Sequence, residues 1–350
     1  VMLIFILAYG FFVRFVPKRT IIFFALACFV VGGVAPAFMS DLFLILIMRG
    51  IFGVGLGFLV PLAVNLVADF YDNRERAVMM GWHSAAVNLG GLLFMFVGTL
   101  LATISWNAAF FVYLIGLVIA VWVMLKLPEP KRIDKKKHEK VKIPSQVLVL
   151  ISGVLLFNAL FYVLMTHLPV MVSGEGLGQA SQAGTALTLF MVGGFFGGMM
   201  YGRTSGILKS YTNTCGWFST GLGIGLIAIS HNILLIAIGA FWAGMSMATT
   251  MPDYLIKISQ RTPLMAVATA LAFASGAAGL GQFLSPIFFE QIIILFDQGI
   301  GRFPIAAGAV ILLAGGLLNF IIINLNRYSG QESTGFSEKD YESIKGDESY

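Results

Sequence analysis

The chain has 350 residues, of which 58% are hydrophobic and only 11% are charged, and it also contains 40 glycines. Soluble domains contain about 45–50% apolar residues with glycine included, so this composition leaves too little polar surface for a soluble enzyme. It also excludes a disordered chain, and the two cysteines, Cys28 and Cys215, are too few for a disulfide scaffold. We therefore expect an integral protein of the plasma or cytoplasmic membrane, surrounded by lipid.

Apolar stretches of helical length recur along nearly the whole chain. A bilayer core about 30 Å thick needs roughly 20 apolar residues of helix. The sequence therefore predicts an all-α, polytopic membrane protein with about eleven helices, the first of them too short to cross. These are Val1 to Val13, Thr20 to Phe38, Leu42 to Ala68, Ala77 to Thr99, Ala108 to Leu125, Val147 to Val170, Gly184 to Tyr201, Thr214 to Ile229, Ile233 to Met251, Leu264 to Phe289 and Pro304 to Ile323.

The basic residues indicate how the chain is oriented. Of the 22 Lys and Arg residues, all but Arg49 and Arg302 fall in alternate connections or in the C-terminal tail. By the positive-inside rule, these connections and the C-terminus are expected to be cytoplasmic. The net charge of +5 therefore reflects membrane topology, and we predict no nucleic-acid partner.

The polar stretch 128–146 is the natural boundary between two parts of the chain. It contains a run of lysines and is predicted to be a basic cytoplasmic linker. We expect an N-terminal helical bundle in residues 1–127, a C-terminal bundle in residues 147–326, and a disordered cytoplasmic tail in residues 327–350.

The two parts are related by an internal repeat. A shift of 191 residues brings Gly53 onto Gly244 and Pro61 onto Pro252, and the predicted helices superpose in order, length and direction. Because Val147 to Val170 then maps to positions before residue 1, the repeat predicts a helix that precedes the present chain. The complete protein is expected to have two bundles of six helices, with the first helix missing here.

Three segments resemble a known family. The segment from Ala68 to Ala77, followed by Gly81 and Trp82, looks like the connection between helices four and five of the major facilitator superfamily. Arg49 with the glycines at 53, 55 and 57 is similar to that family's motif in helix four, and Leu125 to Pro130 is typical of the end of helix six. The resemblance covers the chain from Val1 to about Arg327. It implies two six-helix bundles and a transport activity.

The resemblance also implies residues that couple conformational change to transport. Those in or near the matching motifs are Arg49, Asp69, Arg74, Glu75, Arg76, Gly10, Lys18 and Arg19. The pattern between helices two and three departs from the family, because Arg14 stands where an acid is expected and Pro17 where a glycine is expected. For Arg49, the alternative is a side chain that extends to the membrane surface near Asp41. For the charges around Asp69, the alternative to a latch is an ordinary solvated loop.

Five polar or aromatic residues lie near the midpoints of their predicted helices. Their amides and rings suit a mostly apolar solute that needs few hydrogen bonds, although contacts between helices are the alternative for each. No acid lies at the midpoint of a predicted span, and the histidines stand at least 29 residues apart, without metal-ligand spacing. The predicted substrate-binding residues are Asn88, Asn158, Tyr162, Trp242 and Gln282.

The sequence therefore favours a monomeric secondary transporter that moves a small amphipathic or hydrophobic molecule by alternating access. Protons are the candidate coupling ion, with efflux as the direction. The alternative within this class is uptake of a sugar or another polar metabolite. A membrane-embedded enzyme or a sensor is disfavoured because catalytic clusters are missing from the sequence, and no cofactor or metal is expected.

Overall fold

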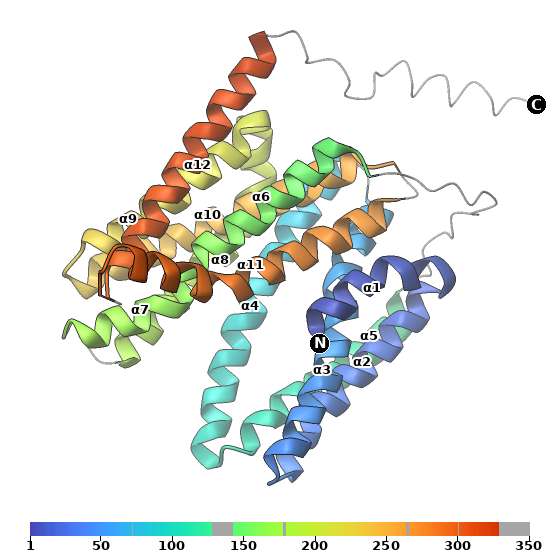
Figure 1. The fold of residues 1–350 in the computed structure, drawn as a ribbon. Coiled ribbons are helices and arrows are strands. Elements are labelled where there is room, and N and C mark those ends of the chain that lie inside the picture. Colours follow the sequence, from blue (N-terminus) through green and yellow to red (C-terminus); the bar gives the residue numbers. More distant parts are fainter. Residues whose placement is uncertain (72, 128–142, 178–179, 264–265, 300, 329–350) are drawn as a thin grey trace, which may run out of the picture.

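The computed structural model describes residues 1–71, 73–127, 143–177, 180–263, 266–299 and 301–328 (Figure 1). The described part of the chain before the linker consists of helices and their short connections. Its helices are α1 Met2–Phe15, α2 Lys18–Val34 with the short η1 Ala35–Phe38, α3 Leu42–Phe70, α4 Asn73–Ile104, η2 Ala108–Leu114 and α5 Ile115–Lys126. We refer to these elements as the first half.

The second half begins after the linker, and its described residues also form helices and short connections. Its elements are α6 Ser145–Phe161, α7 Val163–Gly174, α8 Ala180–Leu208, the short η3 Lys209–Tyr211, α9 Thr212–Ile229, α10 Ile233–Gln260, α11 Val267–Leu295 and α12 Phe303–Tyr328. The predicted all-α, polytopic fold is thus confirmed.

Nine helical segments within the described residues are long and apolar enough to cross a membrane. One of them, Gln182–Ile229, runs over α8, η3 and α9. It is 48 residues long, and the turn at Lys209, whose φ is 47°, divides it. Met2–Val13 is a shorter apolar helix. Counted with the divided segment and this short helix, the structure agrees with the eleven helices expected from the sequence.

The helix bounds support the internal repeat. Adding 191 to the bounds of α3 gives 233–261, and α10 spans Ile233–Gln260; the same shift takes α4 to 264–295, and α11 spans Val267–Leu295. Both α3 and α10 begin with a side-chain cap, from Asp41 and Asn232 respectively, and both contain an internal proline. Among the described residues, α6 and α7 have no counterpart in the first half. The bundle boundaries expected from the sequence stay a prediction.

The helix ends define two sides of the molecule. We call the side where α5 ends and α6 begins the linker side, and the opposite side the far side. The basic residues of the described connections, such as Lys18, Lys126 and Arg261, lie at linker-side helix ends, whereas Arg302 lies on the far side. Whether the linker side faces the cytoplasm stays a prediction.

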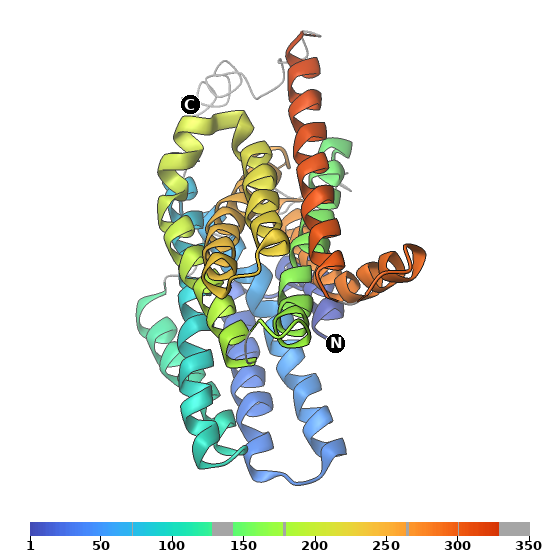
Figure 2. The same ribbon diagram turned by 90° about the vertical axis from the view of Figure 1, so that its left-hand side faces the viewer.

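The two halves touch mainly through α4 with α8 and through α1 with α11. A buried apolar cluster near the linker side combines Met80 and Val64 of the first half with Tyr201, Leu271 and further residues of the second. Toward the far side, α4 exposes Leu93, Phe96 and Ile104. Figure 2 shows the first-half helices, blue to cyan, extending below the second half. The halves are therefore joined near the linker side.

Candidate functional site

Asn158, which is 1% exposed and lies on α6, makes polar contacts with two other helices. The Gln282 Nε2 atom of α11 donates to Asn158 Oδ1 at 3.3 Å. The Asn158 amide in turn donates to Met251 Sδ of α10 at 3.3 Å and to Val154 O at 2.8 Å. Gly281 lets α6 approach closely, because a Cβ there would collide with Leu155 O. Three helices of the second half therefore meet at one amide.

Tyr162 lies one helical turn beyond Asn158, at the break between α6 and α7. Its backbone N–H donates to Asn158 O, and its ring packs edge-on against Phe161 at 6.1 Å between centroids. It packs against the main buried cluster of the second half. Gln282 is thus a side-chain neighbour of Asn158, and Tyr162 follows it along the chain. That these residues form a common site stays a prediction.

Trp242 lies elsewhere on α10. Nine residues separate it from Met251, or about 13 Å along a helix. Its ring nitrogen donates to Ser219 Oγ of α9 at 2.9 Å. It is exposed, as are Leu235 and Ile238 on the same stripe of the helix. Trp242 therefore faces away from the buried core of the second half.

Asn88 lies in the contact between the halves. Its amide donates to Ser84 O of its own helix at 2.8 Å, and its side chain occupies the space that a Cβ at Gly194 of α8 would need. The residue is 9% exposed. The structure thus gives Asn88 the α8 backbone as its neighbour rather than the Asn158 cluster.

Arg49 on α3 is surrounded by aromatic rings. Its guanidinium carbon lies 4.7 Å from the centroid of Phe110 and 5.3 Å from the centroids of Phe52 and Tyr113. The carboxylate of Asp41 caps the start of α3 by accepting from Phe43 N at 2.7 Å. A guanidinium stacked on rings is stabilised by their negative faces. Arg49 therefore joins α3 to η2 near the far side.

The charged residues near the α3–α4 turn whose contacts are described bind partners within the first half. Lys18 of α2 pairs with Asp69 of α3, and Arg19 donates to Met124 O at 2.9 Å. Arg76 donates to Ala68 O at 2.8 Å and to Tyr71 O at 3.1 Å, which satisfies carbonyls at the end of α3. Glu75 is exposed, and the side chain of Arg74 lies outside the described residues.

Each ion pair among the described residues joins residues of the same half. The contact between the halves near the linker side instead uses small residues. A Cβ on Gly10 of α1 would lie 3.1 Å from Thr269 Cα of α11, and one on Gly81 of α4 would lie 2.5 Å from Gly198 O of α8. Gly10 therefore has a packing role in this contact, whereas Lys18 and Arg19 act inside the first half.

Two buried polar contacts were not anticipated from the sequence. Asn65 donates to the hydroxyl of Tyr9 at 2.8 Å within the first half. Tyr201 donates to Asp253 at 3.3 Å, and Lys257 lies 2.7 Å from the same carboxylate. The available signal was a polar residue inside an apolar span, which rarely stays unpaired in a membrane. Among the described residues, no group of three His, Cys, Asp or Glu side chains could hold a metal ion.

A polytopic helical fold made of two repeats, joined along two helix pairs, is typical of a membrane transporter. The chain belongs to the Major Facilitator Superfamily, whose model matches residues 1–212, more than half of its length. Members of this family are transporters rather than enzymes, so the choice of a transporter over a membrane-embedded enzyme is confirmed.

Solved structures share the fold. The human organic anion transporter MFSD10 superposes with a TM-score of 0.79 at 15% identity, covering 91% of this chain and 80% of that one. The fucose:proton symporter of Escherichia coli superposes with a TM-score of 0.69 at 12% identity, covering 90% and 87%. At these low sequence identities, the similarity supports the fold but not a shared substrate or mechanism.

Curated relatives differ in what they carry. A triacylglyceride transporter of Mycolicibacterium smegmatis is 35% identical over 137 residues, which are 39% of this chain and 24% of that protein. The 3-(3-hydroxy-phenyl)propionate transporter of Escherichia coli is 24% identical over 321 residues, covering 88% of this chain and 78% of that protein. The chain thus spans about a quarter of the length of the first of these relatives.

Proposed function

We propose that the protein transports a small amphipathic or hydrophobic molecule by alternating access. The observation that carries this proposal is the Asn158–Gln282 amide pair, set beside the thioether of Met251 and the aromatic residues Phe157 and Tyr162. Such a cluster offers few hydrogen-bonding groups and much apolar area, so if it becomes accessible during transport it suits a solute of the same character. The described acids lie toward helix ends instead.

The curated relatives are consistent with this substrate class. Several proteins that match part of the chain are named as triacylglyceride transporters, including one of Mycobacteroides abscessus that is 32% identical over 146 residues. Their names describe an apolar solute. Because the match covers only 28% of that relative, the substrate of the present protein is inferred from the wall around Asn158 as well.

We propose export as the direction of transport. We assign the linker side and the C-terminus to the cytoplasm, because the basic connections lie there. With the halves joined on this side, the structure represents a state closed to the linker side, which an exporter passes through when it releases its substrate on the far side. Protons are the proposed coupling ion, and we propose a monomer as the working unit, with substrate and lipid as its partners.

The alternative is uptake of a polar metabolite. A specific observation favours an aromatic acid within this group: the 3-(3-hydroxy-phenyl)propionate transporter matches over most of both chains. An aromatic ring could pack on Tyr162 while the amides of Asn158 and Gln282 bind its polar groups.

Reconstitution of the full-length protein in liposomes separates the two proposals. One arm follows a fluorescent triacylglycerol, and the other follows radiolabelled 3-(3-hydroxyphenyl)propionate, each with and without a pH gradient. We expect movement of the lipid solute, accelerated by the gradient. Movement of the acid alone would establish the alternative, and equal rates with and without the gradient would rule out proton coupling.

The role of the amide pair is tested by Asn158→Leu. Because the substrate and Gln282 both lose a partner, the initial rate should fall about tenfold, equivalent to about 1.4 kcal/mol. Asn324→Leu is the matched control, since Asn324 also donates to the carbonyl four residues earlier but lies near the linker-side end of α12. Equal losses per folded molecule in the two variants would remove Asn158 from the site.

A further inference from the structure

Asp253 is a carboxylate buried inside a membrane-spanning helix. It is 5% exposed, whereas every other Asp or Glu of the described residues is exposed. It lies on α10, seven residues before Gln260, where the helix ends, or about 10 Å from the linker-side end. An ionisable group inside a span is costly, and such a group usually has a function. The role of this acid is therefore the question.

Tyr201 of α8 connects this carboxylate to the contact between the halves. Its hydroxyl donates to Asp253 Oδ1 at 3.3 Å. Its ring is buried in the cluster that also contains Met80 of α4, and a Cβ on Gly81 of α4 would lie 3.1 Å from Tyr201 Cβ. Helix α4 also packs directly on α10. The first half therefore covers the phenol that bonds to Asp253, and separation of the halves would uncover it.

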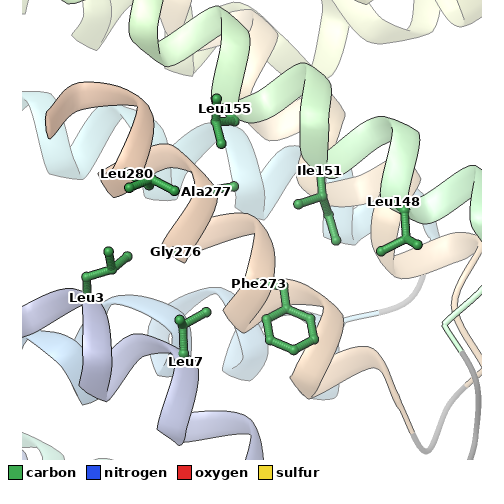
Figure 3. Close-up of a pocket in the computed structure, with 9 residues that line it drawn as sticks. All are labelled: Leu3, Leu7, Leu148, Ile151, Leu155, Phe273, Gly276, Ala277 and Leu280. Atoms are coloured by element: carbon green, nitrogen blue, oxygen red, sulfur yellow. The ribbon is translucent and has the colours of Figure 1, made fainter. Parts of the chain in front are cut away.

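The other contact between the halves is bordered by an apolar groove (Figure 3). Its lining side chains come from α1, α6 and α11, and Leu7 of α1 and Phe273 of α11 are among them. All of the lining residues are apolar. This groove therefore offers no group whose charge could respond to protons, in contrast to the contact of α4 with α8.

Asp253 also lies close to the Asn158 cluster along α10. Met251, two residues earlier, accepts from the Asn158 amide and packs against both the main cluster of the second half and the cluster near the linker side. Pro252 stands between them and has no N–H for the carbonyl of Ala248. A helix bends more easily where this hydrogen bond is missing. A solute that moves Met251 can therefore also change the position of Asp253.

Few charged groups surround this carboxylate. Lys257 and Arg261 of α10 act on it electrostatically, and Tyr201 of α8 donates to it. Tyr254 follows it on α10, and the Tyr254 hydroxyl accepts from a tryptophan of α9 at 2.9 Å. The described residues of α4, α6 and α11, which also pack on α10, bring no further charged group to Asp253. The charge of Asp253 is therefore balanced from its own helix.

The partners of Asp253 tolerate both of its protonation states. Lys257 Nζ lies 2.7 Å from the carboxylate and also donates to Ser210 O at 3.3 Å. The Lys257 side chain is 20% exposed, so water reaches it as well. The hydroxyl of Tyr201 can donate to the carbonyl oxygen of a neutral carboxylic acid. Protonation of Asp253 therefore leaves neither partner without a hydrogen bond.

We propose that Asp253 is the proton-binding residue of the transport cycle, which holds a proton while the linker side is closed and releases it to linker-side water when α4 leaves Tyr201. This proposal rests on the proton-coupled export proposed above. The proton moves from far-side water to a carboxylate oxygen and then to linker-side water, with no other bond changed. Because the solute moves in the opposite direction, inward proton movement drives export.

The sign of the coupling follows from burial. Removal from water disfavours the charged form of a carboxylate, and hydration favours it. Tyr201 and Lys257 favour the charged form, but both belong to the second half and stay with Asp253 when the halves separate. Hydration is therefore what differs between the two states. By linkage, proton binding and the closed contact stabilise each other.

The distance between the halves as a function of pH tests this proposal in the full-length protein in nanodiscs. Spin labels at Glu75→Cys of α4 and Ile207→Cys of α8, with Cys28 and Cys215 replaced by serine, report opening of the linker side. From about pH 8 to about pH 5, the ratio of the short-distance to the long-distance population should rise about tenfold, as expected if the proton binds about ten times more tightly in the closed state. Asp253→Asn, which is neutral at every pH, should keep the low-pH ratio throughout.

Glu175→Gln is the matched control. It also removes an acid from an ion pair, that with Arg302, but on the far side. This variant should keep the pH response of the wild type. A full response in Asp253→Asn, or no response in the labelled protein that retains Asp253, would overturn the proposal.

Tyr201→Phe tests the positioning role of the phenol. It keeps the ring against α4 but removes a donor to the charged carboxylate, so the midpoint of the pH response should move up by about one pH unit. Tyr211→Phe is the control, because it removes a phenol that donates to Asn324 instead. An unchanged midpoint in Tyr201→Phe would remove Tyr201 from the proton site, since a purely structural role would alter stability and not the midpoint.

Transport in liposomes separates this proposal from the coupling on which it rests. A pH gradient should accelerate movement of the fluorescent triacylglycerol in the wild type and in Glu175→Gln, but not in Asp253→Asn. Equal acceleration in the wild type and Asp253→Asn would leave proton coupling in place and overturn the role of Asp253. No acceleration in the wild type would overturn proton coupling itself, and the proposal with it.

Discussion

Several polar residues inside the apolar helices have partners on neighbouring helices. Asn65 bonds to Tyr9, Asn158 to Gln282, and Asp253 lies against both Tyr201 and Lys257. A polar group buried in hydrocarbon without a partner costs several kcal/mol, of the order of 2–7 by model transfer. These hydrogen bonds and the ion pair therefore offset the cost of burying the polar side chains. Pairing does not by itself distinguish a binding residue from a structural one, so each needs its own test.

For Arg49 the structure shows contacts that favour a structural role, and the coupling role expected from the sequence stays a prediction. The sequence suggested a role in coupling, whereas the guanidinium packs among Phe52, Phe110 and Tyr113. We predict that Arg49→Leu lowers the free energy of unfolding by about 1–2 kcal/mol, because the cation–π contacts are lost. Transport per folded molecule should stay within about twofold.

The comparison with Arg49→Lys makes this prediction specific. Lysine keeps the charge but stacks less well, so its unfolding midpoint should lie between those of the wild type and the leucine variant. Thermal unfolding and liposome transport, each normalised to folded protein, are the measurements. A loss of transport much greater than the loss of folded protein would restore the coupling role.

At the scale of the element, short motifs decide where each helix starts and stops. Asp41 and Asn232 cap α3 and α10 at equivalent positions of the repeat, each by accepting from the backbone N–H two residues later. The turn from α8 to α9 is different, because Lys209 adopts a φ of 47°. A side chain in this left-handed region costs about 1–2 kcal/mol relative to glycine.

We therefore predict that Lys209→Gly stabilises the protein by about 1 kcal/mol. Lys126→Gly is the control, since it removes the same charge on the linker side but places glycine in the last turn of α5, where it should destabilise by about the same amount. Thermal unfolding followed by tryptophan fluorescence measures both. A loss of stability in Lys209→Gly would show that its side chain makes contacts worth more than the backbone strain.

At the scale of the whole molecule, glycines of α8 lie in the contact between the two halves. Gly194, Gly198 and Gly202 of α8 recur every four residues and face α4. A Cβ on Gly198 would lie 2.5 Å from Ala85 N and 2.7 Å from Gly81 O. Because backbone atoms cannot move aside as a flexible side chain can, the helices would have to separate. Small residues thus let α4 and α8 pack closely where the halves meet.

Gly198→Ala should move the population away from the state in which the linker side is closed. Spin labels at Glu75→Cys of α4 and Ile207→Cys of α8, both exposed positions, should report a longer distance. Gly206→Ala is the control, because a Cβ there meets nothing within 4 Å. If both variants kept the wild-type distance, α4 and α8 would be able to absorb the methyl group, and the contact would not control the opening.

The sequence alone determined the class of protein, the helices and the repeat, because runs of apolar residues, caps and prolines are local signals. The shift of 191 residues, which is visible in the sequence, places α3 on α10 and α4 on α11. These features depend on neighbours along the chain. The same reasoning also placed Asn158, Tyr162 and Gln282 at similar membrane depth.

Only the tertiary structure decided which way each side chain faces. Helices that are apolar on every side carry little rotational information. Their similar depth in the membrane therefore led to the prediction that Asn88 and Trp242 lie with Asn158. The rotation of the helices instead directs Asn88 toward Gly194 and Trp242 toward Ser219. In the same way, Asp69 pairs with Lys18 rather than across the halves, because the packing of α2 on α3 brings together residues 51 positions apart.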